Sequence, residues 1–511
     1  MKKGKKLKSD SRATPPNPIA NYLTSDTSSL TKRQTPILWD QTANENSDST
    51  PIKPCSNNLI DNSIISPFKK NPQNYYEEEN HNESHEDYNS EIDEKTKMTG
   101  YDPYHTSYNC KNRIPKSKRK VLDAVHSFIT FDDFAWEYID TPQFQRLRGL
   151  KQLGFCNYVY PGAVHTRFEH SLGVGHLAGI FMENAFKNSI SEEINMSAQD
   201  RSYYKQSVML AGLFHDLGHG PFSHSFDAMV IPTIKPGIKW SHEDASEMML
   251  DYLIDDNNID IEKDQIRLIK SLIKPSDEVL ATAENKWIYE IVANYKTSID
   301  VDRWDYMTRD PQMTGLTDLK FDSSMFFENY AILNNKVVFN KKMAPRLNDF
   351  FNHRYKLFKY LYLNASSVSF DFMYQDLMVL ANEDWKFEEI IYQPEEYMKL
   401  NDGILFKLED SKNKNITDLV KRFNNRDNYK FIGELNLPLN KKRKFSKNDI
   451  DKITKDIVGY QKLNGHSLSQ QLRPEDLCVD TVNITYIPAN HYKNIQLYDP
   501  HSKSFLFLIK N

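Results

Sequence analysis

Cysteine and long apolar runs are both scarce in this sequence of 511 residues. The four cysteines, Cys55, Cys110, Cys156 and Cys478, are far apart and include no C-x-x-C pair. This argues against a disulfide framework and against a zinc site built from cysteine. No segment approaches the roughly 18 apolar residues of a membrane span, and no apolar stretch follows the basic first residues as in a secretory signal. We therefore expect a soluble, intracellular protein that does not enter a membrane.

Neither sign of charge is in large excess. The chain has 65 Lys and Arg against 70 Asp and Glu, a net charge of −5, which excludes a strongly basic nucleic-acid coat protein. Two local basic clusters, Lys116–Lys120 and Lys441–Lys444, leave weak nucleic-acid binding open. The second cluster is also typical of a nuclear-import signal or a solvated face, so we expect residence in the nucleus, the cytoplasm or both.

Composition divides the chain into three regions. Among the 28 phenylalanines only Phe68 precedes Phe128, and small polar and acidic residues dominate that early part. Such a segment cannot bury enough apolar surface to offset its ordering entropy. We predict a disordered low-complexity segment at 1–112, a helical domain at 113–375 and a smaller α+β lobe at 376–511.

Apolar spacing predicts a mainly helical centre. Apolar residues recur at three-residue steps from Phe144 to Leu153, and Thr141 with Pro142 could start a helix there. Further helical patterns lie at 172–186, 208–214, 243–253, 288–295, 298–309 and 347–362. Strand-like patterns occur only late, at 336–339, 478–484 and 504–508.

Histidine is concentrated in one stretch, where seven of the 15 lie between His165 and His242. Histidine is both a common metal ligand and a common acid–base group. In this stretch the doublet His215-Asp216 follows an apolar segment that reads as a buried helix, so both side chains need partners. A hydrogen-bond network without metal would meet that need, and so would a divalent ion.

Two further residues complete a ligand set for that ion. His170 precedes the doublet and Asp302 follows it, each in a segment with an apolar face that predicts a helix. Nitrogen and oxygen ligands together suit Mn, Fe, Zn or Mg. The ordered pattern His, His-Asp, Asp resembles that of the HD-domain phosphohydrolases.

The flanking sequences narrow the resemblance. They read RFEHSLGV at 167–174, HDLGHGPFSH at 215–224 and IDVDRWDY at 299–306. Together they resemble the deoxynucleoside triphosphate triphosphohydrolases of the eukaryotic SAM-and-HD-domain type, although no SAM domain is readable in residues 1–110. The resemblance covers the chain from about Lys120 onward. It implies an HD-domain helical core and hydrolysis of dNTPs to deoxynucleoside and inorganic triphosphate, in control of the dNTP pool.

The resemblance also implies residue roles. Contacts to the triphosphate fall to Arg167, His219, His224, His242, Arg303, Tyr306 and Arg354. Sugar or base contacts fall to Gln152, Leu153, Asp310 and Tyr362. We expect His224 to protonate the leaving 5′-oxygen, with Asp227 and Glu243 orienting the histidines, and a further Mg to arrive with the substrate. We assign His165 and His176 to structure.

Other positions bear on activation and specificity. Lys120, Asp140, Gln145 and Arg148 match activator-nucleotide positions of the family, which implies a GTP or dNTP activator and a homo-oligomer, a dimer or tetramer. The segment Leu122–Ser127 departs from the family's Asn-Asp-Pro-x-His-Gly, so we predict an altered activator requirement. Phe358 stands where the family has histidine, and Leu363 where it has glutamine, so base contacts are expected to differ.

Two other functions are compatible with parts of the pattern. One is a different HD-type phosphohydrolase acting on a nucleoside monophosphate or cyclic nucleotide, which would not need Arg303, Tyr306 and Arg354 together. The other is a nucleic-acid-binding regulatory protein with a vestigial site, against which the complete four-ligand set argues. Product analysis separates the first from triphosphohydrolase activity, because only the latter releases inorganic triphosphate.

Overall fold

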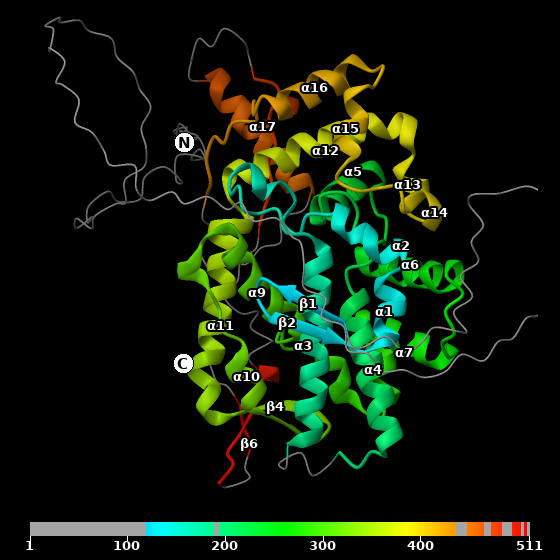
Figure 1. Cartoon of the computed structure of the whole chain (residues 1–511). Helices are drawn as coiled ribbons and strands as arrows, with labels where there is room; N and C mark the ends of the chain where they lie inside the picture. Colours follow the sequence, from blue (N-terminus) through cyan, green and yellow to red (C-terminus); the bar gives the residue numbers. More distant parts are fainter. Residues whose placement is uncertain are drawn as a thin grey trace, which may run out of the picture. The chain divides into compact units, whose positions relative to one another are not determined.

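A computed structural model describes residues 119–188, 194–435, 447–463, 472–482, 493–501 and 505–507. The predicted disordered segment, the basic cluster Lys441–Lys444 and most of the cluster Lys116–Lys120 lie outside these residues. The described part is mainly helical, as predicted, with two small sheets (Figure 1). No helix in it combines the length and the apolar character needed to cross a bilayer.

The centre of the fold is helix α3 (Arg167–Lys187), which packs against both α4 (Ala198–Phe214) and α9 (Val301–Thr314) (Figure 1). Helix α3 is buried on most sides, and small residues let its neighbours approach closely. A Cβ atom built on Gly212 of α4 would lie 3.1 Å from the Cα of Gly175 on α3. These three helices carry all four predicted metal ligands or lead directly into them, so their packing sets the distances within the site.

The close contact between Gly212 and Gly175 predicts how a substitution at Gly212 changes the stability of the fold. Gly212→Ala forces the two helices apart, and overpacking of this kind costs about 1–3 kcal/mol. That exceeds the gain of about 0.5–1 kcal/mol from replacing a helical glycine. We expect a net loss in the free energy of unfolding measured with urea. Gly459→Ala in α17 (Lys447–Leu463) is the matched control, since its Cβ would meet no atom within 4 Å. Equal stabilities of the two variants would contradict close packing at Gly212.

The other elements surround this centre. The longer helices are α6 (His242–Asp256), α7 (Lys263–Ile273), α11 (Ala344–Leu357), α12 (Ala365–Trp385) and α16 (Lys414–Asn424). The shorter helices are α1 (Asp133–Ile139), α2 (Pro142–Gln145), α5 (Ile231–Ile234), α8 (Asp277–Thr282), α10 (Ser324–Glu328), α13 (Phe387–Ile390), α14 (Pro394–Tyr397) and α15 (Ile404–Glu409). The 3-10 and π turns are η2 (Arg146–Gly149), η3 (Gly154–Tyr158), η4 (Ser225–Val230), η5 (Lys286–Glu290), η6 (Thr317–Leu319), η7 (Lys341–Met343), η8 (Phe358–Tyr362) and η9 (Pro474–Asp476).

Two sheets accompany the helices. Strands β1 (Arg119–Asp123) and β2 (Ser127–Phe131) form an antiparallel hairpin at the start of the described chain. The second sheet has the order β3 (Tyr330–Leu333), β4 (Lys336–Asn340), β5 (Gln496–Tyr498), β6 (Phe505–Phe507). Its β4–β5 pair is parallel and its other two pairs are antiparallel. The last two strands of the described chain therefore extend the β3–β4 hairpin of the helical part.

Several secondary-structure predictions were wrong. The expected helix from Phe144 to Leu153 is the single turn α2 followed by the 3-10 turn η2, because a three-residue apolar spacing also fits the 3.0-residue period of a 3-10 helix. Thr141 does cap α2, accepting a hydrogen bond from the Phe144 backbone N–H at 3.3 Å.

The segment 288–295 contains only the end of η5, and residues 478–482 form no strand. Strand-like structure is also not confined to the late chain, because the β1–β2 hairpin comes first. Its five-residue strands are too short for an alternating pattern to stand out. The predicted boundary at 375/376 falls inside α12, and the division into a core domain and a lobe stays a prediction.

Candidate metal centre and phosphate site

The four predicted metal ligands converge on one point. His170 lies in the first turns of α3, His215 and Asp216 end α4, and Asp302 lies in the first turn of α9. His170 Nε2 is 3.1 Å from Asp302 Oδ1, 3.3 Å from His215 Nε2 and 3.5 Å from Asp216 Oδ2. His215 Nε2 is 3.4 Å from Asp216 Oδ2 and 3.6 Å from Asp302 Oδ1. Helices far apart in the sequence therefore bring two imidazoles and two carboxylates together.

These spacings are close to those around one divalent ion, whose ligand atoms at about 2.1 Å stand about 3.0–3.4 Å from one another. His170, His215 and Asp216 each offer an atom within 4.8 Å of the others, and Asp302 faces this group through the two histidines. Each histidine also has its other ring nitrogen engaged, His170 Nδ1 with Asp305 Oδ2 at 2.7 Å and His215 Nδ1 with the Gly212 carbonyl at 2.7 Å. Metal-binding histidines are oriented in this way by acceptors behind them. The four residues thus suit a metal centre, and their chemistry does not select one metal.

Charge around His170 favours a cation. Burial lowers the pKa of this histidine, but the carboxylates of Asp302 and Asp305 outweigh burial and raise its pKa to about 10. The same two carboxyl groups have pKa values below their usual range, despite burial, because positive groups surround them. A cluster of carboxylates this dense is stabilised by a positive charge held among them.

The sequence analysis missed Asp305, which is fully buried and completes the orientation of His170. Gly173, one turn beyond His170 on α3, is also part of this arrangement, because a Cβ atom there would collide with the Asp305 carboxylate. Asp305 stands inside the motif at 299–306, three residues after a predicted ligand. No spacing rule separates it from a surface aspartate, so only the packing of α3 against α9 identifies it.

Arg167 connects the metal ligands to the loop that follows them. It is buried, and its Nη1 donates to Asp216 Oδ2 at 2.6 Å. Its Nε donates to Ser223 Oγ at 3.0 Å, and its Nη2 donates to the Gln152 carbonyl at 3.3 Å. A guanidinium in this place provides fixed positive charge beside the metal centre, as a phosphate group requires.

The predicted catalytic histidines form a cluster next to that arginine. The rings of His219 and His242 stack with centroids 4.0 Å apart, and His224 packs edge-on at 4.9 Å from His219 and 5.3 Å from His242. His242 Nδ1 is 2.6 Å from Asp227 Oδ2, and His224 Nδ1 is 3.5 Å from Asp227 Oδ1. Glu243 lies 3.5 Å from His242 Nε2. One carboxylate therefore contacts two imidazoles, and the orienting role of Asp227 stays a prediction.

The three histidines differ in charge and access. Burial and the charge of Arg167 lower the pKa of His219 well below its usual range, so this ring is neutral. Burial also lowers the pKa of His242, but Asp227 outweighs it and the pKa is raised. His224 is open, with 65% of its side chain exposed. His219 is fully buried, and its Nε2 lies 3.2 Å from Asp216 Oδ1, so it connects the histidine cluster to a predicted metal ligand.

A second group of side chains could also bind a metal ion. It consists of His219, His224, Asp227 and His242, and one ligand atom of each lies within 4.8 Å of the others. We favour the first set of four, because the histidine nitrogens there face one another with their acceptors behind them. In the second cluster His242 Nδ1 is already bonded to Asp227, and two of the rings stack face to face.

Two of the four predicted sugar or base contacts meet where α9 faces η8. Tyr362 donates its hydroxyl to Asp310 Oδ2 at 2.7 Å, and His165 Nε2 is 2.8 Å from Asp310 Oδ1. Tyr306 meets Tyr362 edge-on with ring centroids 6.3 Å apart. The carboxylate of Asp310 is thus fixed from two sides, which gives His165 the structural role predicted for it.

Further candidates differ in how they are engaged. Arg303 is paired with Asp300, the residue that caps α9. The guanidinium of Arg354 lies 4.6 Å above the Phe358 ring, and its Nε has no hydrogen-bond partner. Gln152 is buried with an unpartnered Oε1, and its neighbour Leu153 packs against the core. Gln152 and Arg354 therefore each offer a free polar atom to a ligand.

Three of the four predicted activator positions lie along α1–η2. Arg148 Nε donates to Gln145 Oε1 at 2.7 Å and its guanidinium lies 3.5 Å above the Phe168 ring. Asp140 pairs at 2.5 Å with Arg119 of β1, the strand that also carries the exposed Lys120. Arg119 thus connects Asp140 to the strand of Lys120, while Gln145 and Arg148 form a separate pair, and the role of the four positions stays a prediction.

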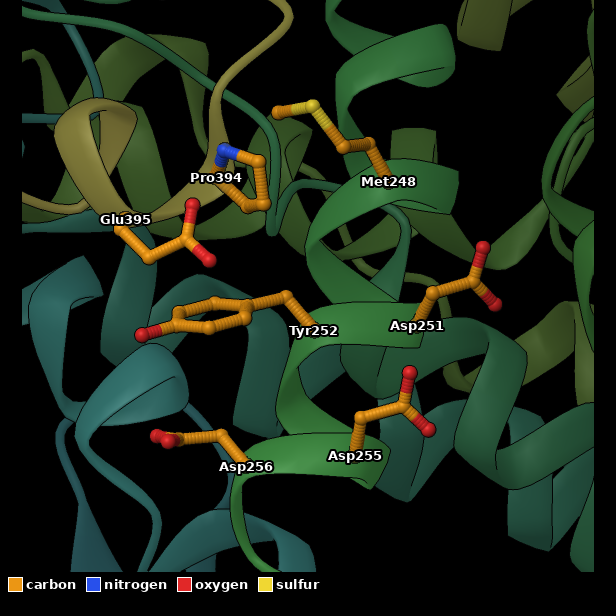
Figure 2. A pocket seen from close by; sticks show the side chains of 7 residues that line it. All are labelled: Met248, Asp251, Tyr252, Asp255, Asp256, Pro394 and Glu395. Atoms are coloured by element: carbon orange, nitrogen blue, oxygen red, sulfur yellow. The ribbon is translucent and has the colours of Figure 1, made fainter.

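A separate open hollow of about 550 Å³ lies between α6 and α14, and Figure 2 shows the side chains that line it. It begins at Met248, six residues after His242, which is about 9 Å along the helix axis. Its lining is acidic, with carboxylates at Asp251, Asp255, Asp256 and Glu395. A triphosphate would be repelled there, so the hollow is not an alternative substrate site.

Comparisons with known proteins agree with this geometry. A family model described as HD domain matches residues 167–310. The chain is 32% identical over 401 residues to the deoxynucleoside triphosphate triphosphohydrolase SAMHD1 homolog of Dictyostelium discoideum, covering 77% of this chain and 74% of that relative. It is 34% identical over 411 residues to deoxynucleoside triphosphate triphosphohydrolase SAMHD1 of Bos taurus, covering 73% and 68%. The chain belongs to the SAMHD1 family of HD-domain deoxynucleoside triphosphate triphosphohydrolases, which confirms the resemblance seen in its motifs.

Proposed function

We propose that this protein hydrolyses deoxynucleoside triphosphates to deoxynucleoside and inorganic triphosphate. The observation that carries the proposal is that two facing histidines each lie 3.1–3.6 Å from two aspartates, beside a buried arginine. Membership of the family supplies the substrate class. The reaction adds water across the bond between the α-phosphorus and O5′, so oxygen ends on the triphosphate and a proton on O5′.

The metal set has one defined task in this proposal. A divalent ion held by His170, His215, Asp216 and Asp302 supplies a Lewis acid for a phosphate oxygen and lowers the pKa of a bound water. Mn, Fe, Zn and Mg all suit these ligands, and a further Mg is expected to accompany the triphosphate.

The neighbouring side chains hold the triphosphate. Arg167 and His242, whose pKa is raised by Asp227 against the effect of burial, attract its oxygens, and the neutral ring of His219 lies beside them without adding repulsion to Arg167. Arg354 offers its free Nε as a further donor. These groups are fixed before substrate arrives, so little reorganisation is needed during the reaction.

His224 is our candidate for protonating O5′. It is the open member of the histidine cluster, whereas His219 is buried and His242 is bonded to Asp227. The Asp227 carboxylate, 3.5 Å from His224 Nδ1, orients the ring from which the proton is delivered. A proton at O5′ turns a poor alkoxide leaving group into an alcohol.

Discrimination against ribose depends on the sugar pocket. Gln152 offers a buried acceptor, and the Tyr362–Asp310 pair offers a fixed hydroxyl and carboxylate. A pocket whose polar groups are already placed rejects an added hydroxyl by crowding and by desolvation. Phe358 brings an apolar ring where relatives have histidine, so we expect base selection to rely on stacking.

Product analysis tests the proposal directly. We expect each dNTP, incubated with the purified protein and Mn²⁺ or Mg²⁺, to give equal amounts of deoxynucleoside and inorganic triphosphate on ion-exchange chromatography. Each NTP should react at least about tenfold more slowly. Release of orthophosphate with no triphosphate would instead indicate another HD-type phosphohydrolase.

We further propose a nucleotide-responsive homo-oligomer, supported by the match of Lys120, Asp140, Gln145 and Arg148 to activator positions of the family. Because Leu122–Ser127 departs from the family's activator segment, we expect GTP alone to shift the sedimentation coefficient little, and GTP with dNTP to shift it only in part. A complete shift to tetramer by GTP in analytical ultracentrifugation would contradict the altered requirement.

A further inference from the structure

The β1–β2 hairpin reaches the metal centre through its turn. Asp123 organises that turn, since its Oδ1 accepts hydrogen bonds from the backbone N–H groups of Val125 at 2.9 Å and His126 at 2.8 Å. The turn projects His126 inward, where 11% of its side chain remains exposed. His126 Nε2 lies 2.6 Å from Asp305 Oδ1, across a sequence separation of 179 residues.

Asp305 is the residue that links the hairpin to the metal ligand. Its Oδ2 accepts from His170 Nδ1 at 2.7 Å and from Arg309 Nε at 2.7 Å. Its Oδ1 accepts from His126 Nε2 and from Arg309 Nη2 at 2.9 Å. Four N–H donors therefore fix both oxygens of a fully buried carboxylate, and only one of them belongs to a metal ligand.

The hairpin also determines how Asp305 meets its other two partners, His126 and Arg309. His126 bonds Asp305 directly, and Arg309 is held by Asp123, which accepts from its Nη1 at 2.8 Å and its Nη2 at 3.3 Å. Without the hairpin, Asp305 would lose its bond from His126. Arg309 would lose Asp123, its second carboxylate partner. The orientation of the Asp305 carboxylate behind His170 thus depends on Asp123 and His126, which precede it by about 180 residues.

We propose that the β1–β2 hairpin is a positioning element for the metal centre and that His126 acts on His170 through Asp305. Nε2 of His170 can bind a cation only if Nδ1 carries the proton, and Asp305 fixes that tautomer and the angle of the ring. His126 touches neither metal nor substrate, so it is a positioning residue. This inference rests on the proposed metal centre. It adds that metal binding there requires the β1–β2 hairpin.

Metal affinity tests the inference apart from activity. Full-length protein is stripped with chelator and titrated with Mn²⁺ alone, with free Mn²⁺ followed by electron paramagnetic resonance. We expect His126→Ala to weaken Mn²⁺ binding about tenfold, at the lower end of the effect of losing a partner behind a ligand. His126→Gln can still donate toward Asp305 and should recover most of the affinity.

Two comparisons separate positioning from general damage. His176→Ala is the matched control, because His176 packs against the His126 ring at 5.8 Å and belongs to the same helix as His170. It should bind Mn²⁺ like wild type. In an Asp305→Asn background, His126→Ala should have no further effect on affinity, because the route of coupling is already broken.

The outcomes distinguish the two levels of the proposal. Wild-type affinity in His126→Ala, or an undiminished effect in the Asp305→Asn background, overturns the positioning role and leaves the proposed reaction standing. Absence of Mn²⁺ binding in wild type overturns the metal centre itself. If His126→Ala does not fold, His126→Leu, which keeps volume but lacks a donor, replaces it with the same expected loss.

Discussion

Asp302→Ala is expected to abolish both metal retention and dNTP hydrolysis. The carboxylate lies 3.1 Å from His170 Nε2 and 3.6 Å from His215 Nε2, so it faces both histidine ligands at once. Its removal leaves two neighbouring imidazoles facing each other across a site with one carboxylate fewer. We expect turnover of dATP to fall at least about a thousandfold and bound Mn or Fe to fall well below one ion per chain. Chromatography of products and elemental analysis after gel filtration measure the two effects.

The chain offers a matched control for this variant. Asp318 lies in the exposed turn η6, shortly after the helix that carries Asp302, and Asp318→Ala removes the same chemical group from the surface. It should keep full activity and full metal content. Asp302 keeps 29% of its side chain exposed and caps no helix, so its variant should still fold and unfold cooperatively. Substantial turnover by Asp302→Ala with its metal retained would refute the ligand assignment.

The predicted metal ligands could be singled out in the sequence because they stand in motifs. His215-Asp216 is a doublet at the end of an apolar helix, and His170 and Asp302 each lie near a helix start with characteristic flanks. Local pattern and order along the chain were sufficient for these residues. The packing that brings them to 3.1–3.6 Å follows from the close contact of α3 with α4 and α9.

The partners behind the ligands could not be found in this way. His126 and Asp305 are 179 residues apart and meet only because the hairpin folds back onto α9. The hairpin itself was missed, since two five-residue strands carry too few residues to show alternation. Similarly, the π-helix η8 ends α11 at Phe358, and no spacing in the sequence distinguishes it from a continued α-helix. Long-range contacts and local changes of helix type are set by tertiary packing.

His224→Ala is expected to slow the reaction without loss of metal. His224 contacts Asp227 and the rings of His219 and His242, and none of the four metal ligands. Its side chain is mostly exposed, so removing it should cost little stability. If it delivers the proton to O5′, kcat should fall about 10²–10⁴-fold, the usual contribution of a general acid. Metal content should equal that of wild type, in contrast to Asp302→Ala.

A change of leaving group identifies the step. Sulfur in place of the bridging 5′-oxygen leaves as a thiolate, which needs no proton, so the deficit of His224→Ala should shrink to less than about tenfold with this dNTP analogue. His501→Ala, which removes an exposed histidine outside the cluster, should match wild type on both substrates. An equal deficit on the oxygen and sulfur substrates would assign His224 to binding the triphosphate. The proton would then have to come from His242, whose pKa Asp227 raises against the effect of burial.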